Sequence, residues 1–396
     1  MTGARHRVAL INNAPTPYRV YFHERLAREL VDVECWSVFT HAISNAHWQL
    51  NMPEQIRPVE FGAHQDSQGA DHWGAQPKEW RKAGRVIQWL ETHDIQAVIL
   101  GGYNDLGRLR IARWCRSHGV PCFLFGDSNV HAGRAAGYRG WLKQRLLSRI
   151  LSWFTGVLCC GSAGEAYFQQ YGVPPERIFR VPYDTDYDAI RYLAPERARS
   201  AGQRFGLDPD RRYLIYAGRL APEKRVDLLL KAFVQLAEEF PGWDLLVVGS
   251  GPDQAALAAL AAPVSARVHW TGFVNAFDDL AALYGHASAA VLPSDYEPWG
   301  VAVTEAATRM PVVASSVVGS ALDVVRDGEN GRLFRAGDLA SLTECLRDVM
   351  TPARLARMTE AVPALFDAWR QANDPVTGLR RALRQAGLAI PEGAAR

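Results

Sequence analysis

The sequence predicts an α/β protein with two domains, each built on a parallel sheet that helices wrap. Short apolar runs that suit buried strands alternate along the chain with segments of helical apolar spacing, the pattern typical of parallel strands joined by crossover helices. In addition, 396 residues are too many for one ordinary hydrophobic core. Two Rossmann-like domains in succession satisfy both observations.

The first half of the chain supplies the elements of the first domain, which we assign to residues 1–188. Apolar, β-prone runs predict strands at 7–11, 33–39, 97–100, 121–125 and 157–160. Apolar residues three and four positions apart predict helices near 21–30, 78–91, 106–117, 141–154 and 163–171. Strand and helix therefore follow each other throughout this half.

The second half repeats the alternation, and we assign residues 189–373 to the second domain. Strands are expected at 213–217, 244–248, 268–270, 289–292 and 312–314. Gly218 ends the first of these strands, and helical spacing follows at 226–233. The stretch 187–202, which contains Pro195 and a run of Arg and Ala, is expected to connect the two domains.

The C-terminal segment 355–387 has helical spacing, with breaks expected at Pro363 and near 373–375 because proline cannot donate the helical hydrogen bond. The last part, residues 374–396, reads as a separate helix. From periodicity alone it could simply finish the second domain.

Composition and charge describe an ordinary globular protein. Hydrophobic residues make up 48% and charged residues 22%, and a net charge of +2 argues against a dedicated nucleic-acid binder. The cysteines form no C-x-x-C pair and no zinc spacing with histidine, so they are expected to be reduced core residues. The apolar run 8–11 is too short for a signal peptide, and no stretch of about 20 apolar residues could span a bilayer. A cytoplasmic location is expected.

Two carboxylates eight residues apart are the strongest functional signal. Glu297 precedes Pro298 and Gly300, so it should lie on a loop whose glycine lets the backbone approach a ligand. Glu305 follows about two helical turns later, beyond a helix start whose free N–H groups favour an anion. The two carboxylates could accept hydrogen bonds from hydroxyl groups on two parts of a ligand, with the anion between these parts. A sugar nucleotide has this arrangement. The alternative is that Glu297 is an exposed loop residue and that Glu305 is a charge that complements the helix dipole.

Two cations lie in the loop between the strand 213–217 and the helix at 226–233. Arg219 and Lys224 are therefore expected at the sheet edge where doubly wound folds bind ligands. Two cations beside a helix start suit a diphosphate, and Lys224 could stabilise a negative leaving group. The alternative is a solvated loop pair.

With these residues in view, the chain resembles the retaining glycosyltransferases of family 4. The resemblance covers about 213–334 and is carried by five motifs in order. They are G-R-L-x-x-E-K at 218–224, V-V-G-S-G-P at 247–252, T-G-F at 271–273, the E-x7-E pair with its E-P-W-G-V run at 297–301, and D-G-E-N-G at 327–331. It implies the GT-B fold, in which two Rossmann-like domains face each other across a cleft and the last helix, here 374–396, packs back on the N-terminal domain.

The resemblance also implies a reaction and its residues. A nucleotide-sugar, acting as co-substrate rather than cofactor, would give its sugar to an acceptor hydroxyl with retention. From the residues themselves no metal is expected, because the Asp-x-Asp pair at 184 and 186 falls near the hinge between the domains and not at a donor-site strand end. Glu305 would hold the ribose, Arg219 and Lys224 the diphosphate, and Glu297 the sugar. The remaining donor-binding positions are Gly218, Gly249, Phe273, Trp299, Gly300, Val301 and, at the end of the first strand, Asn13 and Ala14.

The N-terminal domain departs from the family pattern. Prolines stand in the loop 12–18 where many members carry glycines, and Tyr-Asp-Thr-Asp at 183–186 replaces the family's Asn-Gly-Val-Asp. Asp127, at the end of a predicted strand, could bind an acceptor hydroxyl or stabilise an oxocarbenium-like centre, and its alternative is an N-cap or Asx turn. His131 could act as a base but reads more simply as a loop residue. These departures put the acceptor chemistry in doubt.

An acid-free stretch runs from residue 128 to residue 164. Within it, Trp141, Leu142, Leu146 and further apolar residues recur at helical spacing beside five basic residues. The segment 134–154 resembles a basic amphipathic helix on an anionic membrane surface, and its alternative is a core-facing helix with a solvated basic face. The membrane interpretation would favour a lipid-linked glycan acceptor, as in polysaccharide biosynthesis.

Other functions are compatible with the same diphosphate-binding cations, Arg219 and Lys224. A nucleotide-sugar epimerase or a sugar phosphorylase of this fold would show different products without added acceptor. A non-catalytic protein would bind the sugar nucleotide and never turn it over. The sequence does not name the sugar, the base or the acceptor.

Overall fold

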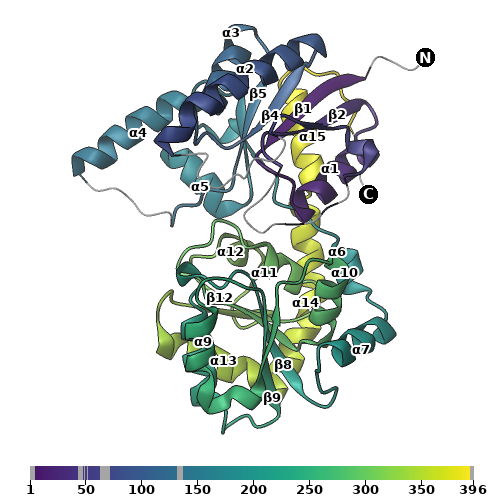
Figure 1. The fold of residues 1–396 in the computed structure, drawn as a ribbon, viewed down its shortest axis with the longest axis vertical. Coiled ribbons are helices and arrows are strands. Elements are labelled where there is room, and N and C mark those ends of the chain that lie inside the picture. The colour runs from purple at the N-terminus through teal and green to yellow at the C-terminus, as the bar shows by residue number, and fades with distance from the viewer. Residues whose placement is uncertain are drawn as a thin grey trace. The chain divides into compact units, whose positions relative to one another are not determined.

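The structure, a computed structural model, describes residues 5–42, 48, 50, 52–62, 72–131 and 137–392. The chain forms two compact units. Unit 1 comprises Met1–Thr185 and Asn373–Arg396, and unit 2 comprises Asp186–Ala372. Each unit is a parallel sheet with helices on both faces (Figure 1). The chain thus has the two Rossmann-like α/β units that the alternation predicts.

The described part of unit 1 holds a seven-stranded parallel sheet in the order β3-β2-β1-β4-β5-β6-β7. Its strands are β1 His6–Asn12, β2 Val33–Phe39, β3 Pro58–Glu60, β4 Ala97–Gly101, β5 Cys122–Gly126, β6 Gly156–Cys159 and β7 Ile178–Arg180. Its α-helices are α1 Pro17–Glu29, α2 Gln76–Thr92, α3 Leu106–Ser117, α4 Gly137–Leu151, α5 Ser162–Gln170 and α15 Pro375–Gln385. Short 3-10 turns lie at Glu54–Ile56, Trp73–Ala75 and Pro175–Arg177. The sequence did not predict β3 or β7, because three-residue strands at the sheet edges carry too little periodicity.

Helix α15 belongs to unit 1, where it covers one face of the sheet. Leu379 and Leu383 are buried in a core cluster with residues of β1, β4 and β7. Gly378 lets the helix approach closely, since a Cβ there would lie 2.1 Å from the carbonyl oxygen of Arg180. Arg25 of α1 donates to Asp184 at 2.6 Å and to Asp374 at 2.8 Å, and so ties α1 to both chain segments that leave the unit, the second of which begins α15.

Unit 2 contains a six-stranded parallel sheet in the order β10-β9-β8-β11-β12-β13. Its strands are β8 Arg212–Ala217, β9 Trp243–Val248, β10 Val268–Gly272, β11 Ala289–Leu292, β12 Val312–Ser315 and β13 Gly331–Phe334. Its α-helices are α6 Tyr187–Arg191, α7 Pro195–Arg204, α8 Val226–Leu236, α9 Gln254–Leu260, α10 Phe277–His286, α11 Val301–Ala306, α12 Gly319–Val324, α13 Leu339–Met350 and α14 Pro352–Ala372, with 3-10 turns at Pro222–Lys224 and Ala262–Arg267. Central strands such as β9 are buried along their whole length, because helices cover both faces.

Two expectations about unit 2 need correction, and one of its strands was not predicted. The stretch 187–202 does not connect the two units but belongs to unit 2, where it forms α6 and most of α7. Helix α14 runs through Pro363 without a break, and Pro363 lies on the exposed side of the helix, where water can satisfy the carbonyl group that proline leaves unpaired. Strand β13 was not predicted, because its four residues include a glycine and an arginine.

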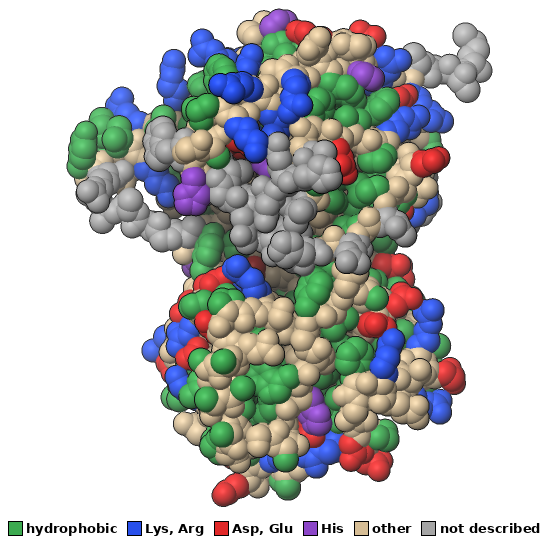
Figure 2. Space-filling view, viewed as in Figure 1, with side chains coloured by type: hydrophobic (Ala, Val, Ile, Leu, Met, Phe, Trp, Pro, Cys, Tyr) green, Lys and Arg blue, Asp and Glu red, His purple; other side chains and the backbone are tan. Residues whose placement is uncertain are grey.

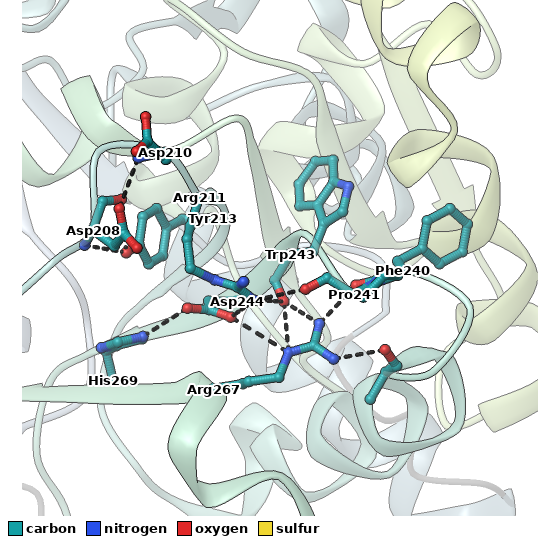
Figure 3. A network of polar contacts seen from close by, with 11 residues as sticks. Asp208, Asp210, Arg211, Tyr213, Phe240, Pro241, Trp243, Asp244, Arg267 and His269 are labelled. Carbon is teal, nitrogen blue, oxygen red and sulfur yellow. Dashed lines mark hydrogen bonds and ion pairs between the residues drawn. The ribbon is translucent and has the colours of Figure 1, made fainter.

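A buried carboxylate fixes the amino end of the unit 2 sheet, opposite the edge that carries the motifs. Asp244 of β9 is 2% exposed and pairs with Arg211, Arg267 and His269 (Figure 3). The Arg267 guanidinium also donates to the carbonyl oxygens of Ala237 at 2.6 Å and Phe240 at 2.7 Å. This network holds the start of β9 against β10 and the end of the α8 segment.

Candidate active site

The loops after β8 and β11, two adjacent strands, meet through an ion pair at the carboxyl edge of the unit 2 sheet. Lys224 ends the 3-10 turn that follows β8, and Glu297 lies between β11 and α11. Their side chains form an ion pair and are only 18% and 14% exposed. The geometry therefore brings together Lys224 and Glu297, which the sequence placed 73 positions apart, and it does not support a solvated loop position for either.

Arg219 lies in the same loop but at its rim. Its guanidinium pairs with Glu223 four residues on, and both side chains are about half exposed. The carbonyl oxygen of Arg219 accepts a 2.7 Å hydrogen bond from the Tyr216 hydroxyl, which anchors the backbone. In this structure Arg219 has the solvated pairing that we considered as the alternative, and its diphosphate role remains a prediction.

Glu305 is a buried carboxylate of α11. It is 8% exposed and accepts a 3.0 Å hydrogen bond from the Tyr284 hydroxyl of α10. Burial and the neighbouring Glu305 carboxylate both raise the pKa of Tyr284 well above its ordinary value, so the tyrosine stays protonated and donates. Glu305 is therefore not an exposed charge that merely complements the helix dipole.

The loop between Glu297 and α11 turns its tryptophan inward. Gly300 has a φ of 91°, a left-handed conformation that suits glycine. The Trp299 ring is 2% exposed, and its centroid lies 6.3 Å from that of Trp369 at the end of α14. Its carbonyl oxygen accepts from the backbone N–H of Ser320 at 2.8 Å. Because the ring is in the core, only the backbone of 299–301, ending at Val301, could meet a sugar.

Glycines let the loops after β8 and β9 pack backbone against backbone. A Cβ on Gly249, whose φ is 136°, would lie 1.9 Å from the carbonyl oxygen of Gly218. Backbone packing therefore explains why residue 249 is a glycine, and the contact of Gly218 and Gly249 with a donor stays a prediction. Phe273 follows β10 at the same edge and is 43% exposed.

The predicted residues of unit 1 lie at the carboxyl edge of its own sheet. Ala14 is buried and its carbonyl oxygen accepts from Arg19 at 3.0 Å, while the buried Oδ1 of Asn13 has no hydrogen-bond partner among the residues that the structure describes. Asp127 follows β5 and accepts a 3.2 Å hydrogen bond from the Tyr183 hydroxyl. No helix begins there in the described residues before α4, so Asp127 is not an N-cap.

His131 is exposed on the loop after β5, and its backbone N–H donates to the Asn129 side chain at 2.9 Å. Sequence analysis missed Tyr284, Tyr183 and Arg19, which position or surround the predicted residues. Tyr284 and Tyr183 lie 21 and 56 residues from the carboxylates that they contact, so no local pattern reveals them.

The described residues include no group of three or more His, Cys, Asp or Glu side chains that could hold a metal ion. The Asp-x-Asp pair near the unit boundary has structural partners: Asp184 pairs with Arg25, and Asp186 caps α6 by accepting from the N–H of Ala189. The described cysteines, Cys35, Cys115, Cys122, Cys159, Cys160 and Cys345, are free thiols in buried positions. Within the same residues, each helix is too short or too polar to cross a membrane.

Known proteins resemble this chain in sequence. The glycogen synthase of Mycobacterium tuberculosis (strain ATCC 25618 / H37Rv) is 30% identical over 59% of this chain and 56% of its own length. The alpha-D-kanosaminyltransferase of Streptomyces kanamyceticus is 30% identical over 53% and 55%, and the D-inositol 3-phosphate glycosyltransferase of Rhodococcus erythropolis is 32% identical over 58% and 53%. The chain thus spans about half the length of the curated relatives that it matches.

Solved structures show the same fold over nearly the whole chain. Sucrose-phosphate synthase from Thermosynechococcus elongatus superposes with a TM-score of 0.75 at 18% identity, covering 96% of this chain and 99% of that one. Anabaena Alr3699/HepE in complex with UDP-glucose gives a TM-score of 0.71 at 18% identity, covering 96% and 100%. The two units therefore have the GT-B fold. A glycosyl transferase 4-like domain matches residues 16–184 and the glycosyl transferases group 1 domain matches residues 200–362, so the chain belongs to the group 1 glycosyl transferases.

Proposed function

We propose that this protein is a retaining glycosyltransferase of family 4 that moves a sugar from a nucleotide-sugar to an acceptor hydroxyl. The observation that carries the proposal is the ion pair between Lys224 and Glu297 at the carboxyl edge of the unit 2 sheet. The buried Glu305 follows eight residues after Glu297. A cation paired with one carboxylate, together with a second, buried carboxylate, suits a ligand that carries a diphosphate and two sets of hydroxyl groups. Doubly wound sheets bind their ligands at this edge.

Lys224 is the group that stabilises the departing diphosphate in this proposal. At 18% exposure it lies where water screens poorly, so its charge acts strongly on charge that develops nearby. Without a donor, Glu297 neutralises it. When a donor binds, the ammonium group would meet the diphosphate, and Arg219 would turn from Glu223 to join it.

The two carboxylates hold the two ends of the donor. Glu305 would accept from the ribose hydroxyls, with Tyr284 fixing the orientation of its carboxylate. Glu297, with the backbone of 299–301, would bind the sugar, and the left-handed conformation of Gly300 sets the course of that backbone. At the edge of unit 1, Asn13 and Ala14 would offer backbone N–H groups to the phosphates, and Asp127 would lie near the reacting sugar.

The reaction exchanges one bond at the anomeric carbon for another. The bond to the diphosphate oxygen breaks with its electron pair, the acceptor oxygen forms a bond on the same face, and the departing phosphate takes the acceptor proton. This needs no protein base and no metal, so we expect metal-independent turnover.

For the acceptor, we propose a glycan on a lipid carrier, used at a membrane surface in polysaccharide biosynthesis on the cytoplasmic side. The basic, apolar segment 134–154 supports this choice. The test is to supply purified lipid-linked and water-soluble glycans with donor and to identify the products. Transfer to soluble glycans alone would overturn the lipid-linked part and leave the donor chemistry standing.

The donor chemistry is tested by measuring release of nucleoside diphosphate from UDP-, GDP- and dTDP-sugars. UDP-glucose comes first, because a structure of the same fold was solved with it. Lys224→Ala should lower kcat by on the order of a hundredfold or more with saturating donor. Lys231→Ala is the matched control, since Lys231 is an exposed lysine of the neighbouring helix α8. Equal turnover in both variants would remove Lys224 from the mechanism.

A further inference from the structure

Helix α4 exposes large apolar side chains that its own unit does not cover. Tyr138, Trp141, Leu142 and Leu146 are 75%, 52%, 49% and 61% exposed, which is unusual for four neighbouring residues of this size. Figure 1 shows α4 reaching away from the unit 1 sheet, and Figure 2 shows green and blue side chains gathered at its outer end.

The helix is fastened to unit 1 mainly by its last turns. Leu147 and Leu151 are buried in the core cluster, and the Ser148 hydroxyl donates to the carbonyl oxygen of Tyr171 at 2.7 Å. The earlier residues 138–146 include no buried side chain among those described. The structure therefore corrects the core-facing alternative: only the second half of α4 faces the core.

The exposed part is positively charged and contains no compensating acid. Lys143, Arg145 and Arg149 are exposed, and the sequence has no Asp or Glu between residues 128 and 164. None of the ion pairs between described residues includes a residue of α4. Of the other basic residues in the stretch, Arg134 lies outside the described residues.

Cations and apolar groups share one side of the helix. With 3.6 residues per turn, Tyr138, Leu142, Arg145 and Arg149 follow at spacings of four, three and four, so they line one side. The Arg145 guanidinium lies 4.9 Å from the centroid of the Trp141 ring, which stacks 6.2 Å from that of Tyr138. The buried Leu147 lies on the opposite side. We call Tyr138, Trp141, Leu142, Arg145, Leu146 and Arg149 the α4 face.

We propose that the α4 face docks on the surface of an anionic lipid bilayer. Tryptophan and tyrosine prefer the interface between headgroups and acyl chains, leucines can enter the acyl region, and arginines can reach back to lipid phosphates. Charge complementarity selects this partner, because a second copy of the face would bring like charges together. The inference rests on the proposed function in one respect: docking would bring the enzyme to an acceptor that is linked to a lipid.

The test uses the full chain and vesicles of phosphatidylcholine, with and without phosphatidylglycerol at about a third of the lipid. We expect co-sedimentation with the anionic vesicles at about 0.01 M ionic strength and release at about 1 M, as the Debye length falls from about 30 Å to about 3 Å. Arg145→Gln with Arg149→Gln should weaken binding by on the order of 20-fold. Leu146→Ser should also weaken it, because part of the binding is apolar.

Matched controls separate the α4 face from general charge and apolarity. Arg113→Gln with Arg116→Gln removes the same charge from the exposed side of α3, and Val31→Ser changes a residue that is 60% exposed, much like Leu146. Both controls should bind like wild type. Wild type that stays in the supernatant at low ionic strength, or controls that lose binding as strongly as the α4 variants, would overturn the inference. Self-association of the protein that the α4 variants abolish, without vesicle binding, would also overturn it.

Release of nucleoside diphosphate, measured without vesicles, keeps this inference apart from the proposed function. The α4 variants should turn over donor like wild type. Failed vesicle binding with intact turnover rejects only the docking face, and vesicle binding without any turnover rejects only the proposed function.

Discussion

A buried histidine beneath the loop after β1 should make unit 1 sensitive to acid. His23 of α1 is 2% exposed, with Nδ1 2.7 Å from the Ser37 hydroxyl and Nε2 3.4 Å from the Asn12 amide nitrogen. Burial, followed by the positive charge of Arg19, lowers the pKa of His23 to about 3. The neutral ring is therefore the form that the fold requires.

The sign and size of the effect follow from this pKa. The unfolded chain takes up a proton on His23 near pH 6.5, whereas the folded chain resists it down to about pH 3. Stability from this residue is complete above about pH 6.5, and the free energy of unfolding falls by about 1.4 kcal/mol for each pH unit below that. At pH 5 the loss is about 2 kcal/mol, a sizeable part of an ordinary stability of about 5–15 kcal/mol.

The measurement is urea denaturation of wild type and His23→Gln, followed by circular dichroism between pH 7.5 and about pH 4. We expect the difference in free energy of unfolding between the two proteins to be constant above about pH 6.5. Below this pH, wild type should lose about 1.4 kcal/mol per pH unit relative to the variant. His23→Asn, which removes more volume, should give another offset with the same pH dependence. A difference that does not change with pH would refute the assignment of a buried neutral His23.

Three further predictions concern the donor site and the fold. Glu305→Gln should weaken UDP binding about tenfold, because a neutral amide replaces a charge-assisted acceptor, and equal affinities in calorimetry would contradict the ribose role. Donor turnover should persist in excess EDTA, so loss on chelation with recovery on added Mg²⁺ or Mn²⁺ would show that the site needs a metal. Asp244→Asn should lower the free energy of unfolding by about 1.5–3 kcal/mol, since it removes the charge of a buried carboxylate that pairs with two half-buried guanidinium groups, whereas Asp210→Asn nearby should stay within about 0.5 kcal/mol. Equal urea midpoints for both of these variants would show that the network adds no stability.

Local pattern was sufficient for the elements whose signal lies within a few residues. Strands β1, β4 and β8 are mainly apolar because helices bury both of their faces, and β2 places two half-buried residues, Glu34 and Trp36, between buried ones, so each was predicted to within one residue at either end. The three- and four-residue edge strands have no such constraint and were missed. Pro363 shows the reverse error, since a rule about local hydrogen bonds predicted a break that packing of α14 overrides.

The candidate site divides in the same way. Sequence spacing alone indicated a loop position for Glu297, a helix position for Glu305 and, for Arg219 and Lys224, a loop at the edge of the sheet where doubly wound folds bind ligands. Only the tertiary structure decided that Lys224 pairs with Glu297 while Arg219 pairs with Glu223, and that the Trp299 ring is in the core. Partner choice depends on which side chains burial brings within reach across 73 residues of chain, and no local period encodes this.

Helix α4 shows the same division between sequence and structure. The sequence determined that its helix would be basic, acid-free and amphipathic, since composition and periodicity are properties of the chain itself. Whether the apolar residues face the core or the solvent depends on what else packs there, and the structure buries Leu147 and Leu151 while leaving Trp141 and Leu146 exposed. Periodicity determines which residues share a side of a helix, and only tertiary packing determines which side is covered.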